Sequence, residues 1–234
     1  MEILNSKQNQ IDNLINSVKA KLIEVNGSYL EIPILTLNPH YIFIAMEPST
    51  GSKSSEQENE KSKNEKMNFI NSKYDLILHY CAYKYLCKNN FDYYITDIAK
   101  APLLVKKAND DNIERIKRWN SWADILLTEL DIFGYKKENG AKIIAIGEKA
   151  YEFMICKNVR VDLCIPHYSW NNSNKIKKMF MSLNIDNNEF DLNNINNFII
   201  QLFALLKINR TFIFKEDVSI KRLFFVYKDL LENI

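Results

Sequence analysis

Short apolar runs alternate with amphipathic segments along this chain of 234 residues. Four runs rich in β-branched and aromatic residues predict strands that are buried on both faces. They lie at 41–46, 93–98, 142–146 and 159–165. Elsewhere apolar residues recur every three or four positions, which predicts helices that bury one side. These helices are expected at 6–25, 67–86, 110–133, 148–156, 198–206 and 222–230.

Strands that alternate with helices predict an α/β domain, in which a central, mostly parallel four-stranded sheet lies between two helical layers. A chain of this length is expected to form a single domain, with its core at about 41–170 and the terminal helices packed on that core. In open parallel sheets, ligands bind beyond the carboxyl ends of the strands. We therefore expect one rim to hold the loops at Glu47, Asp97, Gly147 and His167.

Two polar segments interrupt this pattern. Residues 49–66 are almost entirely Ser, Lys, Glu, Asn and Gln, so they cannot bury enough surface to order themselves, and we expect a mobile loop. An Asn-rich interval separates position 170 from the apolar helix at 198–206, and we predict no element in it. The helices after this interval are expected to complete the core. The alternative is that they extend a DNA surface through Lys207, Arg210, Lys221 and Arg222.

Composition narrows the function classes without selecting one. The formal net charge of +2 is too small to indicate a nucleic-acid binder, so DNA affinity has to come from local clusters. Charged and amide side chains interrupt the N-terminal segment, and the sequence has no run of about 18 apolar residues. We therefore expect a cytoplasmic protein without a membrane partner, and a monomer.

The cysteines, at positions 81, 87, 156 and 164, form no CxxC pair and lack the spacing of zinc or iron–sulfur ligands. We interpret them as reduced residues of the core and expect neither a metal nor another cofactor. The sequence also lacks a GxGxxG or Walker-type phosphate loop, which argues against a nucleotide-binding α/β protein.

Four short motifs follow the predicted strands. In chain order they are Ile44-Ala-Met-Glu-Pro-Ser49, Tyr94-Ile-Thr-Asp-Ile-Ala-Lys100, Ile143-Ile-Ala-Ile-Gly147 and His167-Tyr-Ser169. Each motif is weak alone, but the series resembles that of the uracil-DNA glycosylase superfamily. The resemblance implies a protein that flips a base out of DNA, hydrolyses its N-glycosidic bond and leaves an abasic site. Family members with an iron–sulfur cluster carry a Cys after the Lys of the second motif, where this chain has Ala101.

The resemblance assigns roles to residues of the first motif. Glu47 stands where the family carries the residue that positions the attacking water, and a carboxylate there would also stabilise positive charge on the sugar. The alternative is that Glu47 caps a loop or pairs with a Lys. Met46 and Ser49 are expected to line the base pocket. The most uracil-selective members carry an aromatic ring at the position of Ser49, so the small side chain here leaves room at C5 of the base.

Asp97 replaces the Asn with which the family reads the edge of a flipped uracil. An ionised carboxylate only accepts hydrogen bonds, so it suits the N4 amine of cytosine, with a proton shared at N3, better than the O4 of uracil. Together with Ser49 this predicts a C5-modified cytosine as the target. Such bases occur in phage DNA, so antiphage defence is one interpretation and DNA repair is another. The alternative is that Asp97 turns outward and caps the adjacent loop.

His167 matches the family's last motif, whose His hydrogen-bonds the base O2 and stabilises the leaving anion, although Tyr168 replaces the usual Pro. His40 and His79 are interpreted as structural. Trp170 stands at the position of an apolar wedge that fills the gap left by a flipped base, or it anchors the core. Candidate phosphate contacts are Ser52, Lys100 and Ser169.

These residues together predict a monofunctional DNA glycosylase whose partner is DNA. No Lys occupies a Schiff-base position in the matched motifs, so we expect hydrolysis without strand cleavage. Two alternatives stay open. One is ordinary uracil excision, in which burial keeps Asp97 protonated so that it can donate to O4. The other is a DNA-binding module of the same fold that has no catalytic activity.

Overall fold

The computed structural model describes residues 2–25, 30–48, 67–102, 112–136, 140–168, 173–215 and 217–234. The predicted loop at 49–66 and the predicted helix caps at Asn109 and Asp110 lie outside these ranges. Within them, no helix combines the length and the apolar character that a membrane crossing requires.

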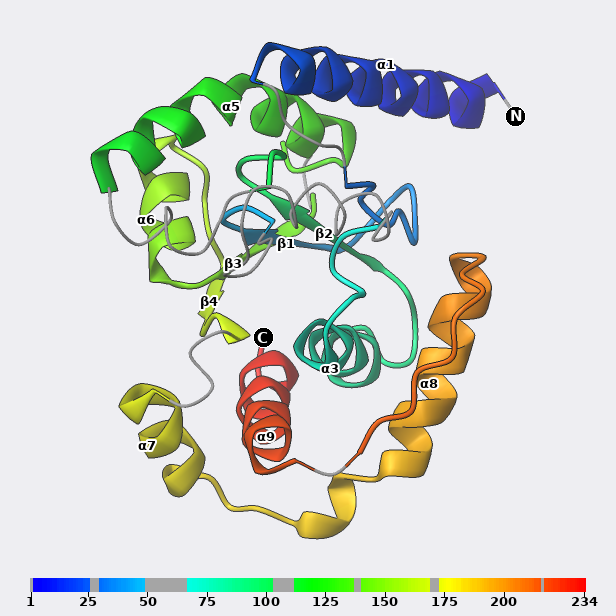
Figure 1. Ribbon diagram of the computed structural model, residues 1–234, viewed down its shortest axis with the longest axis vertical. Coiled ribbons are helices and arrows are strands. Elements are labelled where there is room, and N and C mark those ends of the chain that lie inside the picture. The colour runs from blue at the N-terminus through cyan, green and yellow to red at the C-terminus, as the bar shows by residue number, and fades with distance from the viewer. Residues whose placement is uncertain are drawn as a thin grey trace.

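A four-stranded sheet forms the centre of the molecule (Figure 1). Its strands are β1 (Tyr41–Ala45), β2 (Tyr93–Asp97), β3 (Lys142–Ile146) and β4 (Leu163–Ile165), in the spatial order β2-β1-β3-β4. All neighbouring strands run parallel, and Phe43 in β1 lies opposite both Ile95 in β2 and Ile144 in β3. The predicted α/β/α fold with a parallel four-stranded sheet is confirmed.

Alternate residues of each strand enter two separate hydrophobic clusters, because successive side chains of a strand point to opposite faces. On β1, Ile42 and Ile44 belong to one cluster, whereas Phe43 and Ala45 belong to the other. Both faces of the sheet are therefore buried, which explains why the strands are continuous apolar runs rather than alternating ones.

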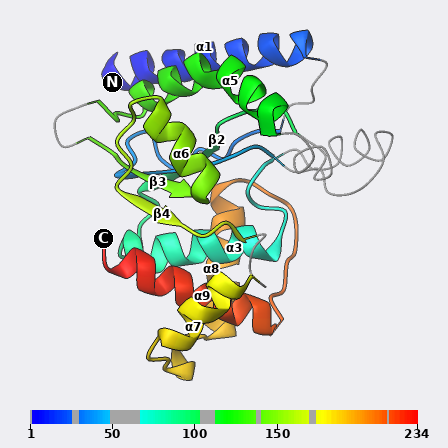
Figure 2. The ribbon, with the colours of Figure 1, turned by 90° about the vertical axis from the view of Figure 1, so that its left-hand side faces the viewer.

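The first helical layer consists of α1 (Glu2–Glu24), α5 (Asn112–Ile132) and α6 (Glu148–Cys156). Figure 2 shows α1 lying along α5 on the side away from the sheet, and the two helices are in contact. The apolar stripe of α1 is buried at Ile11, Leu14, Val18 and Leu22. The N-terminal helix is thus held on the domain through α5.

The opposite layer is built from α3 (Lys73–Cys81) with the π-helical turn Ala82–Leu86, and from the C-terminal helices α7 (Asn174–Ser182), α8 (Leu192–Leu205) and α9 (Val218–Glu232). Helix α9 lies against α3 beneath the sheet (Figures 1 and 2). Its residues Leu223, Phe224 and Tyr227 are fully buried. The C-terminal helices therefore complete the core, as expected from the sequence.

Several boundaries differ from the predictions. Helix α3 begins at Lys73 rather than near position 67, because Ser72 caps it and forms a capping box with Asp75. Strand β4 contains only residues 163–165 of the predicted 159–165. The Asn-rich interval contains α7, whose first turn is capped by the Ser173 side chain, and a short 3₁₀ turn at Asn187–Glu189.

The expectation that all four cysteines belong to the core was wrong for one of them. Cys81 and Cys87 are buried and Cys164 is partly buried, whereas Cys156 is exposed at the end of α6. All four are free thiols.

Candidate functional site

Backbone hydrogen bonds extend the parallel pairing beyond the ends of the strands. The Ile98 amide donates to the Ala45 carbonyl at 2.9 Å, and the Gly147 amide donates to the Ile165 carbonyl at 2.8 Å. The residues that follow β1, β2, β3 and β4 are thereby fixed along one rim, as predicted. We call this rim the carboxyl edge, and it comprises Met46, Glu47, Asp97, Ile98, Gly147 and residues 166–168.

Glu47 is held by side chains from the first turns of α5. One carboxylate oxygen lies 2.5 Å from the Arg115 guanidinium, and the other accepts a hydrogen bond from the Trp119 indole and lies 3.9 Å from Arg118. The Arg115 guanidinium also lies 4.9 Å from the Trp119 ring and contacts the Met46 sulfur at 3.2 Å. Glu47 therefore pairs with arginines rather than with a Lys, and it is a buried carboxylate in a fixed orientation.

Asp97 is the most enclosed carboxyl of the carboxyl edge, with 1% of its surface exposed. Its Oδ2 accepts a hydrogen bond of 2.6 Å from the Asn68 amide. Burial raises the pKa of Asp97 well above its ordinary value, and the nearby negative charge of Glu47 raises it further, while the positive charge of Lys100 lowers it. The alternative in which Asp97 turns outward to cap a loop is excluded by this burial.

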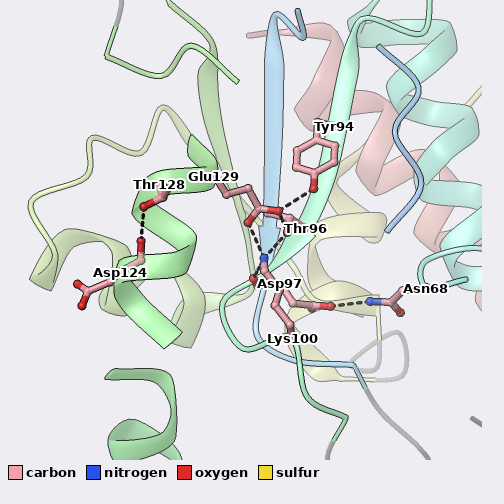
Figure 3. A network of polar contacts seen from close by, with 8 residues as sticks. All are labelled: Asn68, Tyr94, Thr96, Asp97, Lys100, Asp124, Thr128 and Glu129. Atoms are coloured by element: carbon pink, nitrogen blue, oxygen red, sulfur yellow. Dashed lines mark hydrogen bonds and ion pairs between the residues drawn. The ribbon is translucent and has the colours of Figure 1, made fainter. Parts of the chain in front are cut away.

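A polar network next to Asp97 holds the end of β2 (Figure 3). The Lys100 ammonium contacts Glu129 of α5 at 2.5 Å, and it donates to the Thr96 hydroxyl at 2.5 Å and to the Asp97 carbonyl at 2.6 Å. The other Glu129 oxygen accepts from Tyr94 at 2.6 Å and from Thr96 at 3.0 Å. The side chains of Lys100 and Glu129 are only 3% and 2% exposed. Lys100 is therefore not a candidate phosphate contact, contrary to the prediction, because its ammonium is enclosed and paired.

His167 lies directly against Gly147. A Cβ atom at position 147 would stand 3.2 Å from the His167 Cβ, and Gly147 has a φ of +94°, so a side chain there is disfavoured by both space and backbone. Burial lowers the pKa of His167 to about 4, and the positive charge of Arg115 lowers it as well. With this pKa the imidazole is uncharged at neutral pH, and an uncharged imidazole can donate a hydrogen bond through one ring nitrogen.

Tyrosines hold the loop that carries His167. The Tyr168 ring lies against His167 with centroids 4.3 Å apart, and its hydroxyl is hydrogen-bonded to the buried Asp75 carboxyl at the start of α3. The Tyr227 hydroxyl of α9 donates to the Pro166 carbonyl at 2.8 Å. These contacts constrain the turn at which Tyr168 replaces the Pro that the resemblance led us to expect.

The carboxyl edge brings together Glu47, Asp97, His167 and Met46 of the predicted site. Glu47 and Arg115 are close enough to influence the pKa values of Asp97 and His167 respectively. Four predicted site residues lie outside the described residues: Ser49, Ser52, Ser169 and Trp170. Away from the site, His40 is exposed, and the buried His79 shares a hydrogen bond of 2.8 Å with the Tyr93 hydroxyl.

Sequence reasoning missed four residues that complete the site: Asn68, Arg115, Arg118 and Trp119. The last three stand at i, i+3 and i+4 of α5, so they share one helix face. In the sequence this face looks less apolar than the stripe through Ile113 and Ile116, yet those two isoleucines are 69% and 50% exposed. Two arginines and a Trp at helical spacing were the signal that could have identified the face that meets Glu47.

Within the described part of the chain, no group of three or more His, Cys, Asp or Glu side chains is arranged to hold a metal ion. No protein-family model matches this chain, and no curated protein sequence matches it. The residues of the carboxyl edge and their geometry are therefore the basis on which a function can be inferred.

Proposed function

We propose that this protein is a DNA glycosylase that hydrolyses the N-glycosidic bond of a flipped pyrimidine and leaves an abasic site. The observation that carries the proposal is the convergence of Glu47, Asp97 and His167 at the carboxyl edge, where parallel sheets place their ligands. The order of the four sequence motifs, which resembles that of the uracil-DNA glycosylase superfamily, supports it.

Each of the three groups suits one part of the reaction. The neutral His167 imidazole donates a hydrogen bond to the base O2, so it stabilises the negative charge that develops on the leaving base. Glu47 orients the water that attacks the sugar, and its two arginines and Trp119 fix the carboxylate in one orientation. Asp97 binds the Watson–Crick edge of the flipped base.

We propose a C5-modified cytosine as the target, with modified phage DNA as one source of such bases. Because its pKa is raised, the Asp97 carboxyl keeps its proton to a higher pH, and with this proton it can donate to the unprotonated N3 of cytosine. Its second oxygen then accepts from the N4 amine, which gives a bidentate pair.

A second candidate, uracil excision in DNA repair, is favoured by the same pKa. A protonated Asp97 can also donate to the uracil O4 while its other oxygen accepts from N3–H. In the cytosine pose, the Asp97 oxygen opposite position 4 of the base accepts a hydrogen bond. In the uracil pose, the oxygen opposite position 4 carries the proton and donates.

The test is incubation of the protein with matched DNAs that carry one uracil, cytosine, 5-hydroxymethylcytosine or glucosylated 5-hydroxymethylcytosine, followed by alkaline cleavage at abasic sites. We expect cleavage at a cytosine derivative. Glu47→Gln should lower the single-turnover rate by about 10²- to 10³-fold, because the amide neither carries the negative charge nor accepts a proton from water. DNA affinity should change far less.

The matched control is Glu148→Gln. Glu148 opens α6 directly after Gly147, but its side chain is 53% exposed and pairs with Lys175, so the rate should stay unchanged. Release of uracil alone would select the second candidate. DNA binding without release of any of these bases would contradict the catalytic proposal and would favour a binding module, in which the contacts of Glu47 with α5 would be structural.

A further inference from the structure

Asn68 is held in place by a short turn before α3. Its backbone amide donates to the Glu31 carbonyl at 2.7 Å, beside an isolated parallel bridge between Glu31 and Met67. The Asn71 side chain donates to the Met67 carbonyl at 2.5 Å and closes the turn. The backbone at Asn68 is therefore fixed on both sides.

The residue after Asn68 has an unfavourable backbone conformation. Phe69 has a φ of +58°, in the left-handed region that aromatic residues rarely adopt, and its ring is buried in the core. Such strain is unfavourable and persists only where the surrounding packing enforces it, typically at functional sites. The turn thus presents Asn68 to Asp97 at a cost in backbone energy.

The hydrogen bond between these two side chains determines which oxygen of Asp97 is left for a ligand. The Asn68 amide nitrogen donates to Oδ2 at 2.6 Å, so Oδ2 acts as an acceptor. In a protonated carboxyl, an oxygen that already accepts in this way is the carbonyl oxygen, and the proton is on the other oxygen. The charged groups that influence Asp97 are Lys100, Glu47, Glu129 and Arg118. None of them is hydrogen-bonded to the Asp97 carboxyl oxygens among the described residues.

We propose that Asn68 is a specificity-determining residue, which locks the proton of Asp97 on Oδ1 and thereby makes the pocket distinguish 4-aminopyrimidines from 4-oxopyrimidines. This inference rests on the proposed function. With Oδ2 opposite position 4 of the base, the N4 amine of cytosine donates to Oδ2 while Oδ1–H donates to N3. Uracil in the same pose presents O4 to an acceptor and N3–H to a donor, so both contacts are repulsive.

Without Asn68 the proton can occupy either oxygen, so one carboxyl can satisfy both bases. In Asn68→Leu we therefore expect the preference for a cytosine derivative over uracil to fall about tenfold, toward equality, with the faster rate largely retained. In Asn68→Asp the new side chain accepts rather than donates, which draws the proton to Oδ2, and the preference should shift toward uracil. This second variant also covers the case in which the Leu variant fails to fold.

The experiment measures single-turnover release and competition binding on duplexes that differ only in the target base. Asn71→Ala is the matched control, because it loosens the same turn without removing the bond to Asp97. Loss of preference in Asn68→Leu but not in Asn71→Ala supports the inference. An unchanged ratio in both Asn68 variants, or an equal loss in Asn71→Ala, overturns it.

Failure of the proposed function gives different results. If the wild type binds these DNAs but releases no base, catalysis is contradicted, and the ratio of binding affinities still decides the role of Asn68. If the wild type prefers uracil and Asn68→Leu abolishes that preference, the proton lock stands and the cytosine assignment fails. If the wild type neither releases a base nor distinguishes the DNAs in binding, both proposals are overturned.

Discussion

Charged side chains are buried at one end of the parallel sheet and exposed to solvent at the other. At the carboxyl edge the ionic groups are enclosed, and the Glu47 and Arg115 side chains are 4% and 8% exposed. At the amino end, a cavity of about 550 Å³ opens to solvent. We call this region the amino edge, and its lining residues are His40, Tyr41, Tyr135, Lys136, Gly140, Lys142 and Arg160. Here Lys136 and Arg160 are 67% and 71% exposed and pair with Asp131 and Asp162.

This difference indicates where the fold gives up stability for function. Exposed ion pairs contribute little to the free energy of unfolding and lose little hydration, so those of the amino edge need no special explanation. Buried ion pairs lose hydration on both partners, and apolar residues of similar volume often stabilise a fold as well or better. Two buried ion pairs and a buried carboxyl with a raised pKa at one edge therefore reduce stability if stability is their only role. They lie at the end of the sheet where open parallel sheets generally bind their ligands.

The largest effect is expected from breaking the buried pair between Lys100 and Glu129. Lys100→Met leaves the Glu129 carboxylate without its counter-charge, so the free energy of unfolding should fall by about 3–5 kcal/mol. Urea unfolding of the purified variant measures this change. At the amino edge, Lys136→Met breaks an exposed pair and should cost less than about 1 kcal/mol. Equal losses in both variants would contradict the distinction between the two edges.

An intermediate effect is expected from acidification, through His167. Because burial lowers its pKa to about 4, the unfolded chain binds a proton between pH 6.5 and 4 that the folded protein does not bind. His167 therefore makes its full contribution to the free energy of unfolding above pH 6.5. As the pH falls to about 4, the free energy of unfolding decreases by up to about 3 kcal/mol. Burial also lowers the pKa of His79 to about 4. Comparison of the wild type with His167→Gln separates the contribution of His167 from that of His79.

The same residue can be titrated directly by NMR. We expect the His167 ring to titrate with a midpoint near 4 in the wild type. Arg115→Met should raise this midpoint, since it removes a positive charge that opposes protonation. A wild-type midpoint near 6.5 would show that the ring is hydrated, and would contradict the enclosed site assigned to His167.

The smallest effect is expected from Gly147→Ala. The positive φ and the nearby His167 should together lower the stability by about 1–2 kcal/mol, and displacement of His167 should also lower the rate of the proposed base release. Gly134 follows α5 on the approach to the amino edge and also has a positive φ, of +91°. Gly134→Ala should therefore cost stability without changing the rate per folded molecule. A loss of rate in both variants would mean that backbone strain alone explains the result.

The layout of the fold followed from patterns that the chain displays locally. Strands β1, β2 and β3 are apolar runs because both faces of the sheet are covered. The ends of β1, β2 and β4 placed Glu47, Asp97 and His167 on one rim. Helix α7 escaped prediction because it is short and lies in an Asn- and Lys-rich interval, although Ile176, Met179 and Phe180 stand at helical spacing and pack on the core. Its Ser173 cap was a second local signal.

The partners of the site residues were harder to predict, because they are fixed by tertiary contacts. The role of Asn68 depends on a left-handed Phe69 and a bridge to Glu31, neither of which has a local sequence pattern. Lys100 has the sequence context of a surface contact, but Glu129 lies 29 positions later and draws it into the interior. Pairings over such distances appear only once α5 is packed on the sheet.

The hydrogen bond from Tyr227 to the Pro166 carbonyl has a consequence for the order of events during synthesis. The ribosome adds about 5–20 residues per second, so the loop that carries His167 emerges several seconds before the helix that holds it. Until α9 has emerged and packed against α3, one face of the sheet is also uncovered. A nascent chain therefore exposes the motif residues before the loop with His167 is fixed, and the site is completed only when α9 folds.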